Sequence, residues 1–119
     1  MLPPDNRLTD GASFQQTVRV GRRAGSRTVV VHLADEVAGA VGGSGPRIGF
    51  VVSKAVGNAV VRNRVKRRLR HLAREHVSSL PGSAVLVVRA LPAAAAASYA
   101  ELSIDLTRCL ARVRSEARA

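Results

Sequence analysis

The feature that most restricts the fold of this chain is a long amphipathic stretch from Ala59 to about Val77. Its apolar residues recur at helical spacing, at Val61, Val65, Leu69 and Leu72. At about 100° per residue they fall within roughly a quarter of the helix circumference. Asn58 is a favourable N-cap for such a helix. The sequence therefore predicts a helix about 30 Å long, close to the width of a small domain, that packs one apolar stripe against the rest of the fold.

Before Glu75, the remaining surface of this predicted helix carries only positive charge. Residues 37–74 contain nine basic residues and no acidic one, so this third of the chain holds most of the net charge of +11. Like charges one turn apart destabilise an isolated helix, and solvated helix faces ordinarily mix both signs. Most of the basic residues are arginine, which suits bidentate contacts to phosphate. The pattern indicates a polyanionic partner, most often a nucleic acid.

Length and composition narrow the class of protein. The chain has 119 residues, of which 46% are hydrophobic, so we expect residues 1–119 to form a single domain. Cys109 is the only cysteine, which excludes an internal disulfide and a cysteine-based zinc site. The sequence has neither an apolar run of membrane-spanning length nor a signal peptide. We therefore expect a cytoplasmic protein with no membrane association.

The other segments predict a mixed α+β domain with helices packed on a small sheet. We expect a loose tail at 1–10, a turn containing Arg22 and Arg23, and a flexible glycine-rich loop at 35–46. One further short strand is expected without a fixed place. Helices are predicted at 13–20 and after the capping box Ser98–Glu101, and strands at 27–33, 47–52 and 84–88.

Three consecutive motifs resemble a known family. They are Ile48–Lys54 (IGFVVSK), Val56–Val60 (VGNAV) and Arg62–Arg70 (RNRVKRRLR). Together they are similar to the signature block of the protein subunit of bacterial ribonuclease P, and the similarity extends over nearly the whole chain.

The resemblance implies a ribonucleoprotein in which a large RNA removes the 5′ leader of precursor tRNA with magnesium ions held by that RNA. The partners would be this RNA and the precursor tRNA leader, with no obligate protein partner and no cofactor bound by the protein alone. The implied fold is a ribosomal S5 domain-2-like α/β sandwich with a left-handed βαβ crossover. Sequence alone would favour the usual right-handed one.

The resemblance also assigns site residues. The RNA-binding residues would be Ser53, Lys54, Asn58, Arg62, Asn63, Arg64, Lys66, Arg67, Arg68 and Arg70. Phe14, Val18 and His32 would line a cleft for the leader. From spacing alone, Phe14 is a core residue, and Asn58 is explained equally well as a helix cap. Val18 and His32 stand where many members have aromatic residues, and such a cleft offers less base stacking.

Three alternative functions compete with this one, and two of them use the same basic helix. A ribosomal or chaperone-like RNA-binding protein would lack a processing role, and a DNA-binding protein would place the helix in a major groove. A nuclease that acts without RNA would need clustered carboxylates or histidines. The sequence offers no such cluster, and its three histidines lack metal-ligand spacing. We therefore expect no catalytic residue and no metal ligand in this chain.

Overall fold

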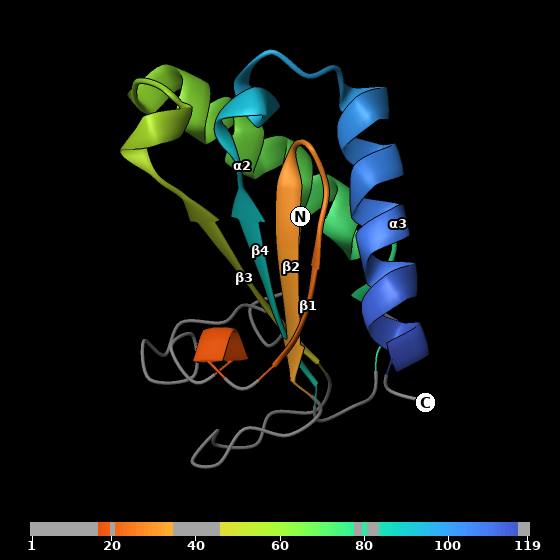
Figure 1. Cartoon of the computed structure of the whole chain (residues 1–119). Helices are drawn as coiled ribbons and strands as arrows, with labels where there is room; N and C mark the ends of the chain where they lie inside the picture. Colours follow the sequence, from red (N-terminus) through yellow and green to blue (C-terminus); the bar gives the residue numbers. More distant parts are fainter. Residues whose placement is uncertain (1–16, 20, 35–45, 78–79, 81–83, 117–119) are drawn as a thin grey trace.

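The structure is a computed structural model that describes residues 17–19, 21–34, 46–77, 80 and 84–116. The strands are β1 (Arg22–Gly25), β2 (Val29–Ala34), β3 (Arg47–Val52) and β4 (Val85–Ala90). The helices are α2 (Ala59–Arg74), α3 (Tyr99–Glu116), the 3₁₀ segments η2 (Lys54–Val56) and η4 (Pro92–Ala95), and a helical segment at residues 17–19. The predicted small mixed sheet with three helices is confirmed (Figure 1).

One four-stranded sheet, in the order β1-β2-β4-β3, organises the fold. β3 pairs with β4 in parallel, and the other neighbours are antiparallel. Figure 1 shows β3 and β4 both running upward, with β4 to the right of β3 and α2 passing behind the sheet. The β3–α2–β4 crossover is therefore left-handed, as the family resemblance implied and contrary to the usual hand.

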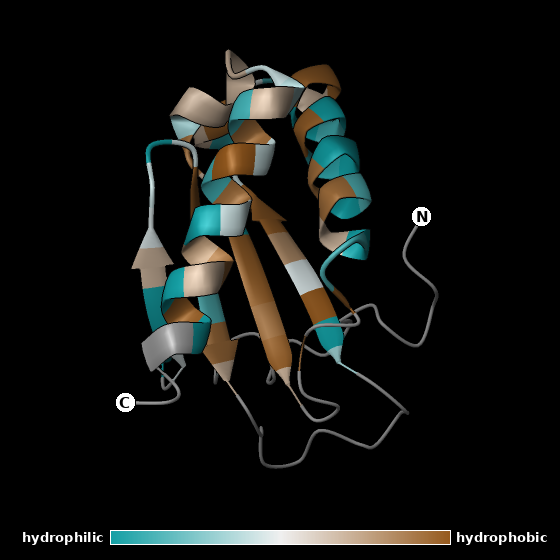
Figure 2. Cartoon of the chain, turned by 90° about the vertical axis from the view of Figure 1, so that its right-hand side faces the viewer, coloured by the Kyte–Doolittle hydropathy of each residue, from teal (hydrophilic) through white to brown (hydrophobic). Residues whose placement is uncertain are grey.

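The core lies between one face of the sheet and the two long helices. Alternate residues of each strand point into it, among them Val31 on β2 and Leu86 on β4. α2 contributes Leu69 and the other residues of its apolar stripe, and α3 contributes Leu106. Figure 2 shows a mostly brown β4 in the centre of the sheet, and helices in which brown residues alternate with teal ones. The apolar stripe predicted for residues 59–77 is thus the surface that seats α2 on the sheet.

Local capping chemistry is as predicted at two helix starts. The Asn58 side-chain oxygen accepts a hydrogen bond from the backbone N–H of Val61 at 3.0 Å. Ser98 and Glu101 form a reciprocal capping box, with each backbone N–H donating to the other side chain at 3.0 and 3.1 Å. Both caps depend on residues three apart, so the sequence alone specifies them.

One secondary-structure prediction was wrong. Arg22 and Arg23 do not lie in a turn but in β1, the edge strand, where Ala24 pairs with Val31 of β2. Ala24 is a single small apolar residue, too little for a hydrophobic pattern, and its pairing with β2 makes the segment a strand. β1 is the further short strand that the sequence predicted but could not locate. The tail at 1–10, the loop at 35–45 and most of the first predicted helix lie outside the described residues.

Candidate nucleic-acid interface

The start of α2 is fixed by a backbone feature as well as by its cap. Gly57 has φ +157°, and a Cβ built there would lie 2.9 Å from Cγ1 of Val61. A side chain at this position would be strained in its backbone and crowded against the first turn of the helix. Glycine therefore allows the chain to turn from η2 directly into α2, which places the basic run at a defined angle to the sheet.

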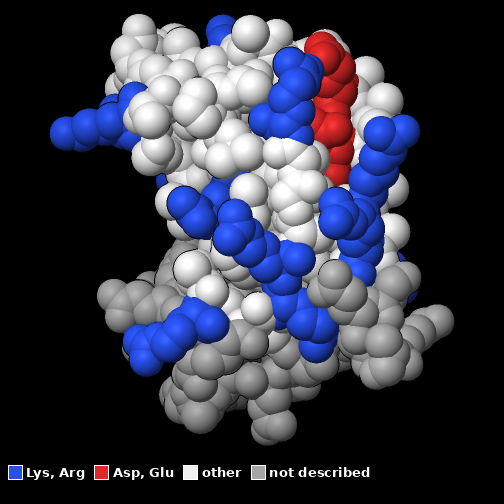
Figure 3. All heavy atoms as spheres, in the orientation of Figure 1, with Lys and Arg blue, Asp and Glu red and all other residues white. Residues whose placement is uncertain are grey.

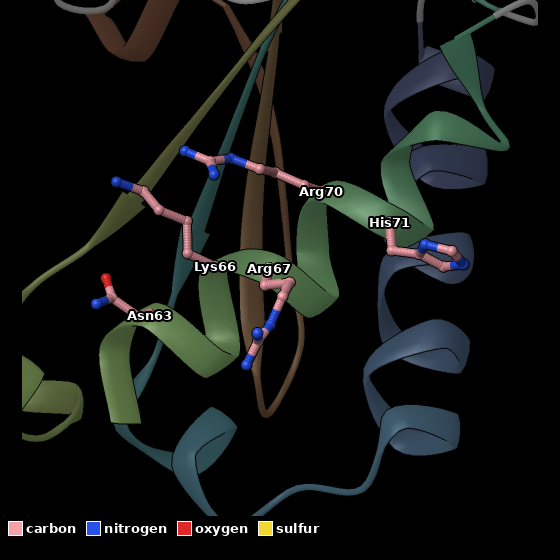
Figure 4. Close-up of a pocket in the computed structure, with 5 residues that line it drawn as sticks. All are labelled: Asn63, Lys66, Arg67, Arg70 and His71. Atoms are coloured by element: carbon pink, nitrogen blue, oxygen red, sulfur yellow. The ribbon is translucent and has the colours of Figure 1, made fainter. Parts of the chain in front are cut away.

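The outer face of α2 is a concentrated cationic surface. Asn63, Arg67 and His71 follow one another at i, i+4 spacing, and Lys66 and Arg70 lie on the adjacent row. These five side chains line a hollow of about 460 Å³. Figure 4 shows Lys66 and Arg70 extended away from the helix and His71 turned toward α3. We call these five residues the α2 basic hollow.

Two arginines of the same run make contacts inside the protein. The Arg64 guanidinium donates to the carbonyl oxygen of Ala95 at 3.2 Å, and Arg68 donates to that of Ala97 at 3.3 Å. Both side chains are half-buried. Arg64 and Arg68 were expected to bind RNA with the rest of the run, whereas the structure gives each of them a contact that ties α2 to the segment before α3.

The residues predicted just before α2 lie beside its N-terminal end. Ser53 precedes η2, and the Lys54 side chain is exposed. Asn58 is exposed as well, but its side-chain oxygen is occupied by the helix cap. Arg62 is half-buried on the first turn. The structure therefore brings Ser53 and Lys54 to the same end of the molecule as the start of the basic run.

The three residues predicted to line a leader cleft differ in how exposed they are and in whether the structure describes them. Phe14 lies outside the described residues, and Val18 is 40% exposed. His32, on the sheet face away from α2, is 2% exposed, so its ring is not the accessible surface that we expected. Neither ring nitrogen has a hydrogen-bond partner among the described residues. Burial lowers the pKa of His32, and the nearby charges of Arg89 and Arg23 lower it further.

Two cations on this sheet face were missed by sequence reasoning. Arg23 on β1 stands opposite His32 on β2, and Arg89 on β4 stands opposite the neighbouring Val30. Both arginine side chains are exposed. Figure 3 views this face and shows Lys and Arg side chains in a band across it. Period-2 alternation along β4 would have put Arg89 on the face opposite Leu86 and Val88, but the placement of Arg23 depended on recognising β1.

Comparison with known proteins shows which family this chain belongs to. The chain matches the family model for Ribonuclease P over residues 2–114. The chain belongs to the ribonuclease P protein family. It is 67% identical to the ribonuclease P protein component of a Nocardioides species, with 98% of this chain and 97% of that protein covered. The component from Streptomyces avermitilis is 54% identical, with 95% of each chain covered.

The fold agrees with solved ribonuclease P proteins. A mutant ribonuclease P protein from Staphylococcus aureus superposes with a TM-score of 0.79 at 28% identity, covering 92% of this chain and 88% of that one. The family resemblance inferred from residues 48–70 is therefore confirmed, and so is the α+β fold class. No described helix is long and apolar enough to cross a bilayer. The described residues also bring together no group of three or more His, Cys, Asp or Glu side chains.

Proposed function

We propose that this chain is the protein component of a ribonuclease P holoenzyme, in which it assists removal of the 5′ leader from precursor tRNA. The observation that carries the proposal is the α2 basic hollow on a chain that belongs to the ribonuclease P protein family. The hollow presents three cationic side chains, Lys66, Arg67 and Arg70, beside an amide. Phosphates of the catalytic RNA would bind these cations, and the amide of Asn63 would add a hydrogen bond.

A second part of the proposal concerns the leader. The sheet face away from α2 carries the exposed guanidinium groups of Arg23 and Arg89, and Val18 is exposed in the segment that precedes β1. A single-stranded leader needs cations for its backbone and apolar or aromatic surfaces for its bases. The family resemblance adds Phe14 as a base contact, whereas the buried ring of His32 offers a base no exposed surface. We therefore assign the leader to this sheet face and the catalytic RNA to α2.

We assign the chemistry to the RNA, with the magnesium ions held there. Two carboxylates of α3, those of Glu101 and Asp105, support this assignment because they serve the fold. The Glu101 carboxylate accepts a hydrogen bond from the Ser98 N–H at the start of α3, and its Oε2 lies 2.6 Å from Nη2 of Arg27. Hydrogen bonds from Ser98, and then the charge of Arg27, hold the pKa of Glu101 below its ordinary value. The Thr28 hydroxyl donates to Asp105 at 2.6 Å. These carboxylates already have partners in the fold.

The test is to purify the tagged protein from its own cells, sequence the RNA that accompanies it and assay the complex on precursor tRNA. We expect a large RNA whose presence is required for cleavage in magnesium, and a cytoplasmic complex. Protein stripped of RNA should not cleave precursor tRNA. Recovery of ribosomal RNA with no cleavage activity would favour the ribosomal or chaperone-like alternative, and cleavage by the RNA-free protein would show that it is a nuclease.

A further inference from the structure

Tyr99 is an exposed aromatic residue in a chain that has only three Phe, Tyr or Trp residues. It is the first residue of α3, and 39% of it is exposed. Its ring centroid lies 6.1 Å from that of His71 on α2, with the two ring planes at 59°. His71 is exposed as well. The junction of α2 and α3 therefore presents two tilted rings to the solvent.

These rings stand at the rim of the α2 basic hollow. His71 is itself one of the five residues that line the hollow, one helical turn beyond Arg67. Figure 4 shows the His71 ring directed toward α3, the helix that carries Tyr99. An RNA segment whose phosphates bind Lys66 and Arg67 would therefore have its next nucleotide close to the two rings.

The position of Tyr99 relative to α2 is fixed from both sides. Arg64 and Arg68 of α2 hold the carbonyl groups of Ala95 and Ala97, just before Tyr99 in the chain. The Ser98–Glu101 capping box then fixes the first turn of α3. The backbone that carries the ring is therefore ordered before a ligand stacks on it, which lowers the entropy cost of binding.

We propose that Tyr99 and His71 form a stacking platform for an unpaired base of the RNA bound on α2. The proposal rests on the proposed function, because it takes RNA as the ligand of the basic hollow. Proteins that read unpaired RNA place bases on aromatic faces and hold the flanking phosphates with cations. The junction offers both. Arg74 and then Glu75 follow His71, so the two rings lie near the C-terminal end of the basic run on α2.

The test compares Tyr99→Leu with Tyr99→Phe in binding to the RNA subunit of the same organism. Leucine keeps apolar contact with His71 but cannot stack on a base, whereas phenylalanine keeps the ring. We expect Tyr99→Leu to weaken binding about tenfold with an unchanged salt dependence, and Tyr99→Phe to bind like the parent protein. Ile104→Ala is the matched control because Ile104 is an exposed apolar residue of α3, 51% exposed. It should bind like the parent protein.

Chemical probing of the RNA supplies a direct readout. One unpaired base should be protected by the parent protein and by Tyr99→Phe but reactive with Tyr99→Leu. Parent-like affinity and protection in a folded Tyr99→Leu variant would overturn the platform. Failure of the proposed function would appear differently: Arg67→Ala/Arg70→Ala would then also bind the RNA like the parent protein. Thermal unfolding of each variant shows whether a loss of binding comes from a loss of fold.

Discussion

The Arg64 guanidinium donates a hydrogen bond to the carbonyl oxygen of Ala95 at 3.2 Å, across 31 residues of sequence. One arginine of a run that we expected to bind RNA is thus part of the fold. The basic run of α2 therefore has two roles. Some of its arginines hold α2 against the segment before α3, and others present cations to a partner. Its arginines should divide into two groups when stability and RNA binding are measured separately.

Arg64→Ala should lower the free energy of unfolding by about 1 kcal/mol, because the Ala95 carbonyl loses its partner in a half-buried site. Arg67→Ala is the control on the same helix. The Arg67 side chain is exposed, so its removal should change stability by less than about 0.5 kcal/mol. Urea unfolding of the two RNA-free variants measures the difference. Equal losses, or a larger loss for Arg67→Ala, would show that the Arg64 contact does not stabilise the fold.

Gly57→Ala should destabilise the protein by about 1–3 kcal/mol, since the position has φ +157° and a Cβ would lie 2.9 Å from Val61. Gly25→Ala is the matched control, because its Cβ would meet Val30 at 3.7 Å, an ordinary contact. Chemical denaturation of both variants tests the comparison. If Gly57→Ala is no less stable than Gly25→Ala, the backbone at the start of α2 is not restricted to glycine.

The stability of the protein should decrease as the pH falls below 6.5, and His32 should cause part of this decrease. Its pKa is lowered in the folded state, so the unfolded chain takes up a proton first as the pH falls below 6.5. The stabilisation is complete above pH 6.5 and is lost as the pH falls toward the lowered pKa. His32→Phe should flatten this part of the profile. Melting temperatures between pH 7.5 and 5 provide the measurement, and an unchanged slope in His32→Phe would contradict it.

The features that sequence could predict are those set by neighbours in the chain. The Asn58 cap, the Ser98–Glu101 box and the apolar stripe of α2 depend on residues within one or two helical turns of one another. β1 was not predicted because it is a strand only through its pairing with β2.

The residues of the candidate site also fall into two groups: those whose position the local sequence predicts, and those whose position depends on distant parts of the chain. The outward position of Arg67 and Arg70 follows from helical periodicity. The contacts of Arg64 and Arg68 depend on where a segment about 30 residues later folds back onto α2. The burial of His32 and the proximity of Arg23 and Arg89 likewise come from pairing between distant strands. The roles of Phe14, Val18 and His32 in leader binding stay predictions.

The central claim is that RNA binds the outer face of α2, and the salt dependence of RNA affinity tests it most directly. Two double variants remove the same charge, Arg67→Ala/Arg70→Ala on α2 and Arg108→Ala/Arg112→Ala on the exposed side of α3. Each lost phosphate contact should flatten the log–log salt slope by roughly 0.7–0.9. We predict this flattening and weaker binding for the α2 pair, and a parent-like slope for the α3 pair. Equal slopes and affinities in the two variants would contradict the claim, because binding would then follow the total charge and not the α2 face.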